Sequence, residues 1–281
     1  HSTLPEDLRI RAARRALEQA QALYNSEEVE PESFLAGHGV NMGAAAPELR
    51  ELAELLSIPV ATTPKGKGAF CEDHPLALRV FGMAGSPLAE AYLLSGGVDV
   101  LFVIASSLHE NSTSGWDPAL KPRRALLQLD VDASVIGRNY PVDTAMVGDA
   151  KTTLRELIFH LRRLLARGEH PPGADPRAFS RWKAGRPAVL EPEAMASEQV
   201  PVKPQRLMRE LNDSLPEDAL IFLDVGNHTL WAVHYLDATG RNAFIHNWGE
   251  FAAMGTGVAG AVGAKLAAPK RPVVAVVGDG G

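Results

Sequence analysis

Long apolar runs alternate with amphipathic segments along most of the chain. Val98–Ser106, Ala125–Val131 and Val273–Val277 are nearly uninterrupted apolar runs. A strand with one solvent-exposed face would instead alternate apolar and polar residues. Continuous runs are typical of parallel strands that are covered by helices on both faces. The pattern therefore predicts an α/β fold whose parallel sheet is flanked by helices.

Shorter segments fit the same alternation. Further strands are expected at Ser33–Ala36, Ile58–Thr62, Ala145–Val147, Ala219–Leu223 and Ala243–His246. Helices are expected where apolar residues recur every three or four positions. These segments are Arg9–Tyr24, Ala44–Leu56, Ser86–Leu94, Lys151–Leu165, Gln205–Ser214, Thr229–Tyr235 and Met254–Leu266.

The alternation is interrupted once, between residues 168 and 203. Prolines punctuate this stretch and it shows little periodicity, which is typical of a surface linker. A chain of 281 residues is also long for a single domain. We therefore expect a first domain over residues 1–167, a linker over 168–203, and a second α/β unit over 204–281.

Composition narrows the class of protein. With 28 basic and 34 acidic residues the formal charge is −6, so no general attraction to nucleic acid or anionic lipid is expected. No apolar run approaches the roughly 18 residues of a membrane span. The single cysteine, Cys71, excludes an internal disulfide and indicates a reducing compartment. A cytoplasmic protein without nucleic-acid or membrane partners is expected.

The most specific local motif is the turn Gly278-Asp279-Gly280-Gly281, which directly follows the apolar run Val273–Val277. Ligands of open α/β sheets bind at the carboxyl ends of the strands. Glycines allow a phosphate to approach the backbone, and a carboxylate can hold a Mg²⁺ that bridges phosphate oxygens. The alternative is an ordinary turn whose aspartate caps the next helix.

Other strand ends carry comparable residues. Asp224-Val225-Gly226-Asn227-His228 follows the strand expected at Ala219–Leu223. Two such turns on one sheet are able to face a shared diphosphate, with N–H groups of the following helix aimed at it; an ordinary helix cap remains open. In the first half, Gly37–Gly39 and Asp130–Asp132 are candidates for holding a nucleotide.

Gly255–Gly260 matches the dinucleotide fingerprint G-x-G-x-x-G. Taken literally, it indicates a nicotinamide or flavin nucleotide site. The fingerprint should follow a buried strand, however, and here it follows Asn247–Met254, which is not an apolar strand. A helix whose small residues pack closely on a sheet is the competing interpretation.

Taken together and in order, these segments resemble thiamine-diphosphate enzymes of the acetolactate synthase-like group. The segments that carry the resemblance are Gly37–Gly39, Glu48–Pro59, Gly66–Phe70, Phe81–Gly85, Leu129–Gly137, Val147–Lys151, Asp224–Trp231, Ala253–Ala268 and Val273–Gly281. The resemblance implies a Rossmann-like central domain followed by the first part of a thiamine-diphosphate-binding domain. A preceding pyrimidine-binding domain and the remaining diphosphate-domain residues have no counterpart here, so we expect a fragment.

The resemblance also implies roles for individual residues. Asp279 corresponds to a Mg²⁺ ligand, and Gly278, Gly280 and Gly281 belong to the turn that lies against the diphosphate. Met254 corresponds to the bulky residue that supports the bent cofactor. The remaining residues implied to approach the diphosphate are Gly226, Asn227 (a glutamine in the family) and His228.

The implied reaction is the decarboxylation or carboligation of a small 2-keto acid, in which the thiazolium ring accepts the electrons released. The glutamate that activates the cofactor belongs to the missing first domain. We therefore expect no catalytic residue in this chain, no activity from the isolated chain, and a homodimer or homotetramer at full length. Ser106–Leu108 replaces the Gly-Ala-Arg of flavin-binding relatives and Ala84 replaces a histidine, which argues against FAD.

Two alternatives from other classes remain at this point. The first is an oxidoreductase that binds a nicotinamide or flavin nucleotide at Gly255–Gly260. The second is a non-catalytic module for nucleotide binding or subunit contact. A response to NAD(H) without one to thiamine diphosphate would favour the first, and a response to neither would favour the second.

Overall fold

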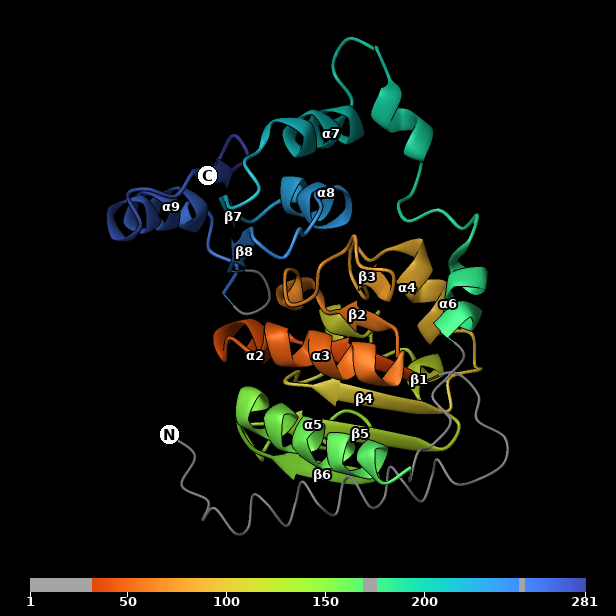
Figure 1. Ribbon diagram of the computed structural model, residues 1–281. Helices are drawn as coiled ribbons and strands as arrows, with labels where there is room; N and C mark the ends of the chain where they lie inside the picture. Colours follow the sequence, from red (N-terminus) through yellow and green to blue (C-terminus); the bar gives the residue numbers. More distant parts are fainter. Residues whose placement is uncertain (1–31, 169–175, 248–250) are drawn as a thin grey trace.

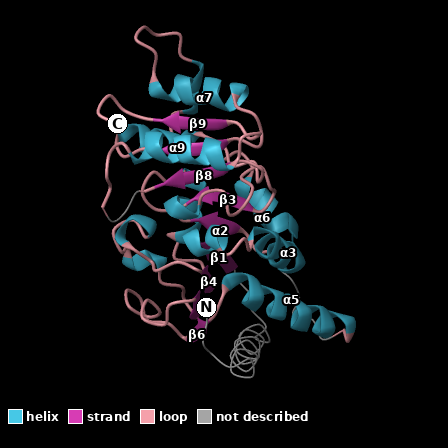
Figure 2. Cartoon of the chain, turned by 90° about the vertical axis from the view of Figure 1, so that its left-hand side faces the viewer, coloured by secondary structure: helices cyan, strands magenta, loops and turns pink. Residues whose placement is uncertain are grey.

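The computed structural model describes residues 32–168, 176–247 and 251–281. Two parallel sheets make up the frame (Figure 1), one of six strands and one of three. Figure 2 shows the labelled strands in one column, with β8 and β3 adjacent where the two sheets meet. The predicted α/β class with parallel sheets is confirmed, since every strand pair in both sheets runs parallel.

The larger sheet has the order β3-β2-β1-β4-β5-β6. This is the doubly wound order whose switch point, here between β1 and β4, forms a ligand crevice. The sheet's apolar strands form the main core with the helices around them. Its strands are β1 (Glu32–Ala36), β2 (Val60–Thr62), β3 (Ala77–Val80), β4 (Val100–Ile104), β5 (Ala125–Asp130) and β6 (Thr144–Val147).

Helices α3 and α5 lie side by side against this sheet (Figure 1). Leu49, Leu52 and Ala53 form the buried face of α3. Asp149 caps α5 by accepting a 2.9 Å hydrogen bond from the Thr152 N–H. The helices of this region are α2 (His38–Met42), α3 (Ala46–Leu56), α4 (Pro87–Leu93), α5 (Ala150–Ala166) and α6 (Pro176–Lys183). The helix predicted at Arg9–Tyr24 lies outside the described residues.

The smaller sheet has the order β8-β7-β9. Its core includes Ile221, Leu223 and Val233, together with Val80 from β3 of the larger sheet. The elements of this region are α7 (Pro204–Ser214), β7 (Leu220–Leu223), α8 (Asn227–Tyr235), β8 (Ala243–His246), α9 (Thr256–Ala267) and β9 (Val273–Val276). Each was predicted to within three residues at either end.

The sequence analysis missed strand β3 and helices α2 and α6. Strand β3 contains Arg79, which interrupts an otherwise apolar run. Helix α6 lies inside the stretch predicted as a linker, and its Phe179 is buried against Tyr92 of α4 with ring centroids 5.6 Å apart. Part of the proline-rich stretch therefore packs on the larger sheet's helices.

Glycines let α9 pack closely on β7. A Cβ at Gly257 would lie 2.8 Å from Asp224 Cβ and 3.0 Å from the Asp224 nitrogen. A Cβ at Gly260 would lie 2.8 Å from the Phe222 ring. The small-residue segment is therefore a packing helix, as the competing interpretation of the fingerprint held.

Replacing Gly257 by alanine should destabilise the protein by about 1–3 kcal/mol, because the new methyl group meets rigid backbone. Gly263→Ala is the matched control on the same helix, since a Cβ there meets nothing within 4 Å. That control should be neutral or stabilise by up to about 1 kcal/mol, from helix propensity. Urea unfolding checks the pair, and equal effects of both variants would contradict this packing.

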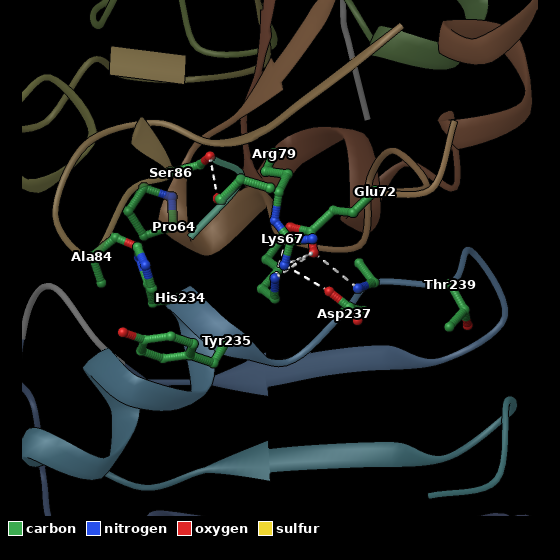
Figure 3. Close-up of polar contacts among 12 residues, drawn as sticks. Pro64, Lys67, Glu72, Arg79, Ala84, Ser86, His234, Tyr235, Asp237 and Thr239 are labelled. Carbon is green, nitrogen blue, oxygen red and sulfur yellow. Dashed lines mark hydrogen bonds and ion pairs between the residues drawn. The ribbon is translucent and has the colours of Figure 1, made fainter. Parts of the chain in front are cut away.

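The two sheets are joined by an ionic cluster, which we define as Lys67, Glu72, Arg79 and Asp237; Lys67 and Glu72 are its buried pair. Lys67 Nζ lies 2.7 Å from Glu72 Oε1, and Arg79 bridges Glu72 at 3.2 Å and Asp237 at 2.7 Å. Figure 3 shows these side chains converging where the two parts of the chain meet. The Ala238 N–H also donates to Glu72 at 3.0 Å. Asp237 and Ala238 follow α8, so the cluster fixes the second region to the first.

Two histidines reinforce this junction. His234 of α8 accepts a 2.8 Å hydrogen bond from the Leu190 N–H at Nε2, and its Nδ1 lies 3.3 Å from the Ala84 carbonyl, to which it donates. His246 at the end of β8 donates from Nε2 to the Pro64 carbonyl at 3.1 Å. Burial lowers the pKa of His234, and it lowers the pKa of His246 to about 4. Both rings therefore join the two regions in the neutral form.

His246 should make the protein acid-sensitive. Its pKa is lower in the folded chain than the unfolded value of 6.5, so the stability it contributes is present above pH 6.5 and is lost as the pH falls toward 4. Wild type should lose about 3 kcal/mol more than His246→Gln across that range. Urea unfolding at pH 6.5 and pH 4 measures the difference, and parallel profiles would exclude this role for His246.

Along the described residues, no helix combines the length and the apolar composition that crossing a bilayer requires.

Candidate functional site

The predicted site residues gather at the carboxyl edge of the smaller sheet. The turn that follows β7 begins at Asp224 and leads into α8, and the turn that follows β9 is Gly278–Gly281. Because β7 and β9 are parallel neighbours, both turns lie at the same edge. The prediction that the two turns share one edge is therefore met by the strand pairing.

His228 lies between the glycines of these two turns. A Cβ at Gly226 would come within 2.9 Å of its Nδ1, and a Cβ at Gly278 within 3.3 Å. Among the described residues, Nε2 of His228 is buried and has no hydrogen-bond partner. A buried polar atom of this kind is costly unless a ligand or water satisfies it. The turns thus hold an imidazole whose second nitrogen is available to a bound group.

The N-terminus of α8 is also open at this place. Gly226 is the N-cap residue and provides no side-chain hydrogen bond, so the first N–H groups of the helix lack a cap of that kind. Asn227 and Gly226 are exposed. Helix N-termini with available N–H groups favour anions. The edge therefore offers an anion position made by Gly226, Asn227 and His228.

The N-terminus of α9 differs, because a carboxylate of the chain already fills it. Asp224 is 1% exposed and accepts hydrogen bonds from the Gly255 N–H at 2.7 Å and the Gly257 N–H at 3.2 Å. Burial by itself raises the pKa of Asp224, but these donors outweigh it and hold the pKa below its ordinary value. The group is an internal anion.

The remaining predicted residues surround the Gly278–Gly281 turn. Met254 is exposed, and its Sδ would lie 3.9 Å from a Cβ at Gly280. A Cβ at Gly281 would overlap with Asp224 Oδ2. Asp279 is exposed at the tip of the turn. Asp279 and Asn227 thus lie at the same edge of the sheet as the other predicted residues.

A metal at this edge would depend on few protein ligands. Within the described ranges, no group of three or more His, Cys, Asp or Glu side chains is placed to hold a metal ion. Asp279 is thus the candidate for a single protein carboxylate that would bind the metal ion. Mg²⁺ commonly uses one or two carboxylates, with substrate phosphates and water completing its shell, so the arrangement suits a phosphate-bound Mg²⁺.

A second candidate site is a cavity of about 550 Å³ at the carboxyl edge of the larger sheet. It lies at the switch point of that sheet, and it unites the two motifs that the sequence analysis singled out, Gly37–Gly39 and Asp130–Asp132. Its polar lining includes His38, Lys65, His109, Asp130 and Asp149. Burial and the nearby Asp132 charge raise the pKa of Asp130. The size lies in the range of small-molecule sites.

Sequence reasoning missed two functionally placed groups. The sequence analysis gave Asp224 no role beyond the turn that contains it, although its carboxylate holds the start of α9. Lys67 appeared only within a family-like segment, although it is fully buried. A local signal existed for Asp224, namely an acidic residue directly after a buried strand. The burial of Lys67 depends on partners that no local pattern reveals.

Two family models match this chain. One is described as "Thiamine pyrophosphate enzyme, central domain" and matches residues 18–157. The other is described as "Thiamine pyrophosphate enzyme, C-terminal TPP binding domain" and matches residues 224–281. The second match begins at Asp224 and includes every predicted site residue.

Curated relatives point to the same family. A probable acetolactate synthase large subunit from Methanococcus aeolicus is 35% identical over 255 residues, which cover 88% of this chain and 42% of the relative. The corresponding protein from Methanocaldococcus jannaschii is 35% identical over 260 residues, covering 90% and 42%. An acetolactate synthase from Mycobacterium bovis is 31% identical over 284 residues, covering 99% and 42%. The chain thus spans less than half the length of these relatives.

Proposed function

Because the chain belongs to the thiamine pyrophosphate enzyme family, we propose that it is the central and diphosphate-binding part of a longer enzyme that uses thiamine diphosphate and Mg²⁺. The observation that carries this is the His228 imidazole, which sits between two glycine turns with its Nε2 unpartnered among the described residues. The activity proposed for the complete protein is the decarboxylation or carboligation of a 2-keto acid.

The residues present fit the diphosphate end of the cofactor. The N–H groups at the start of α8 and the Gly278–Gly281 backbone provide donors without a side chain in the way. Nε2 of His228 adds a further donor when it carries the proton. Asp279 would hold Mg²⁺ against the diphosphate, and Met254 would contact the cofactor beside Gly280. When bound, thiamine diphosphate supplies an electron sink for carbon–carbon bond cleavage.

The contacts at the N-terminus of α9 disfavour the competing nicotinamide or flavin site at Gly255–Gly260. That site requires a pyrophosphate at the N-terminus of α9. The Asp224 carboxylate already accepts the Gly255 and Gly257 N–H groups there. Gly257 and Gly260 also face β7 closely. These glycines therefore serve helix–sheet packing.

The proposal extends to assembly, with a second copy of the chain as partner. On α9, Val258, Val262 and Leu266 follow one another at intervals of four residues and are all exposed. Residues four apart share one helix face, so these three form an apolar stripe that a second copy would cover. Sedimentation equilibrium of the complete gene product should give a dimer or tetramer, and a monomer at high concentration would contradict it.

Carbon dioxide release tests the proposed reaction. The complete gene product, supplied with thiamine diphosphate and Mg²⁺, should release CO₂ from at least one member of a panel of short-chain 2-keto acids. The isolated 281-residue chain should release none, because no residue of it corresponds to the family's activating glutamate. Absence of turnover with every 2-keto acid would contradict the proposed reaction. Robust turnover by the isolated chain would contradict the proposal that the activating glutamate lies outside this chain.

For the cavity of the larger sheet we propose a nucleotide other than FAD. Its volume and its mixture of cationic and carboxylate side chains suit phosphate and ribose groups. Ser106 and Ser107 line it where flavin-binding relatives are expected to carry glycine and alanine, and Leu108, which is buried, stands in place of their arginine. ADP should raise the thermal midpoint of the complete gene product more than FAD does, and the reverse order would contradict this choice.

A further inference from the structure

Asp224 joins four elements of the smaller region. Its N–H donates to the Val276 carbonyl of β9 at 3.0 Å, and its own carbonyl accepts a hydrogen bond from the Thr229 hydroxyl of α8. Its side chain accepts from the N-terminal turn of α9, where the Thr256 hydroxyl lies 3.3 Å from Oδ1. One residue at the end of β7 is therefore bonded to β9, α8 and α9.

The Asp224 side chain also lies against the Gly278–Gly281 turn, which carries Asp279. Gly281 approaches Asp224 Oδ2 so closely that any Cβ there would overlap with it. Met254 lies just before the first turn of α9, which the Asp224 carboxylate holds. Met254 also lies beside Gly280 of the Gly278–Gly281 turn. A shift of the carboxylate would therefore move Met254 and the Gly278–Gly281 turn relative to one another.

The two helix N-termini at this edge are consequently not equivalent. The partial positive charge at a helix N-terminus attracts anions. At α9 that charge is neutralised from within the chain by Asp224, whereas at α8 the N-cap is a glycine without a side-chain bond. An external diphosphate is thereby directed toward α8 and away from α9.

We propose that Asp224 is a positioning residue of the cofactor site, an internal anion that fills the N-terminus of α9, sets Met254 against the Gly278–Gly281 turn, and leaves α8 as the position for the cofactor's diphosphate. The inference rests on the proposed function. Asp224 itself does not touch the cofactor in this arrangement.

The test is chemical rescue of Asp224→Ala in the complete gene product. The variant should bind thiamine diphosphate about 10- to 100-fold more weakly, the usual loss when a charged hydrogen-bond acceptor is removed. Sodium formate has the size of the missing carboxylate, so it should restore much of the affinity and raise the thermal midpoint of the cofactor-free variant. Sodium chloride at the same ionic strength should do neither.

Thr229→Val is the matched control, because it removes a hydrogen bond to the Asp224 backbone without leaving a carboxylate-sized space. Formate should not improve its cofactor affinity. Asp224→Asn serves if the alanine variant does not fold, and it should bind thiamine diphosphate more weakly than wild type and show no response to formate. Wild-type affinity in either Asp224 variant, or equal formate effects on Asp224→Ala and Thr229→Val, would overturn the proposal.

The two proposals fail in distinguishable ways. If wild type does not bind thiamine diphosphate at all, the proposed function is wrong. If wild type binds and the Asp224 variants bind equally well, only the positioning role is wrong.

Discussion

Replacing Asp279 by asparagine in the complete gene product should weaken Mg²⁺-dependent binding of thiamine diphosphate by about 100-fold or more. Asparagine keeps the size of the side chain and suits the turn, but it removes the charge. Even changes in residues that only orient metal ligands cost about 10–100-fold, and Asp279 is proposed as the direct ligand. The measurement is the apparent Mg²⁺ dissociation constant at saturating cofactor.

Asp218→Asn is the matched control for this substitution. Asp218 is exposed like Asp279, but it precedes β7 and so lies at the opposite edge of the same sheet. Its replacement should leave the Mg²⁺ dependence unchanged. Neither variant should shift the thermal midpoint of the cofactor-free protein by more than about 2 °C, since both side chains are exposed. Equal losses of Mg²⁺ affinity in both variants would remove Asp279 from the metal site.

Replacing Glu72 by glutamine should destabilise the folded protein by about 3–5 kcal/mol, the usual cost of breaking a buried ion pair. Burial lowers the pKa of Lys67, and the Glu72 charge opposes that effect. Without the carboxylate, Lys67 stays in the protein interior with the Phe244 ring, whose centroid lies 5.0 Å from Nζ, while the Asp237 charge attracts it and the Arg79 charge repels it. Urea unfolding followed by tryptophan fluorescence measures the loss.

The loss should depend on pH in a defined direction. Removing Glu72 lowers the pKa of Lys67 further in the folded state, while the unfolded lysine keeps a pKa near 10.4. The unfolded variant then binds more protons than the folded variant, so its stability rises with pH. The difference in unfolding free energy between variant and wild type should narrow between pH 7 and pH 10.

Glu210→Gln is the control for Glu72→Gln, because the exposed pair of Glu210 with Arg206 should be worth at most about 1 kcal/mol. A comparable loss of stability in Glu210→Gln would contradict the special role of the buried Lys67–Glu72 pair.

The sequence was sufficient to predict the frame of both sheets. Runs such as Val98–Ser106 and Val273–Val277 are typical of parallel strands that are covered on both faces. The family resemblance implied that His228 and Gly278 approach the same diphosphate, and the pairing of β7 with β9 places their two turns at one edge. The family resemblance was carried by the same segments and was confirmed by both family models.

What the sequence did not reveal depends on distant partners. Arg79 made β3 look unlike a buried strand, yet its charge is met by Asp237, which lies 158 residues further along the chain. Lysine and glutamate are almost never fully buried unless they are paired, so a buried Lys67–Glu72 pair could not be expected from composition. The donors to Asp224 lie 31 to 33 residues further along the chain, and only the packing of α9 on β7 brings them together.

Helix α6 shows a different limit. It starts at Pro176 inside a proline-rich stretch and spans eight residues, too few for a periodic pattern to stand out. Its order derives from tertiary contacts, since Phe179 and Trp182 pack on Tyr92 of α4. Short helices are stabilised mainly by such packing, which a sequence pattern does not display.

Calorimetric titration of the complete gene product with thiamine diphosphate, with and without Mg²⁺, and with NAD(H) for comparison, shows which cofactor the protein binds. We expect saturable binding of one thiamine diphosphate per chain that requires the divalent cation, and no heat from NAD(H). Saturable binding of NAD(H) together with no response to thiamine diphosphate and Mg²⁺ would contradict this expectation.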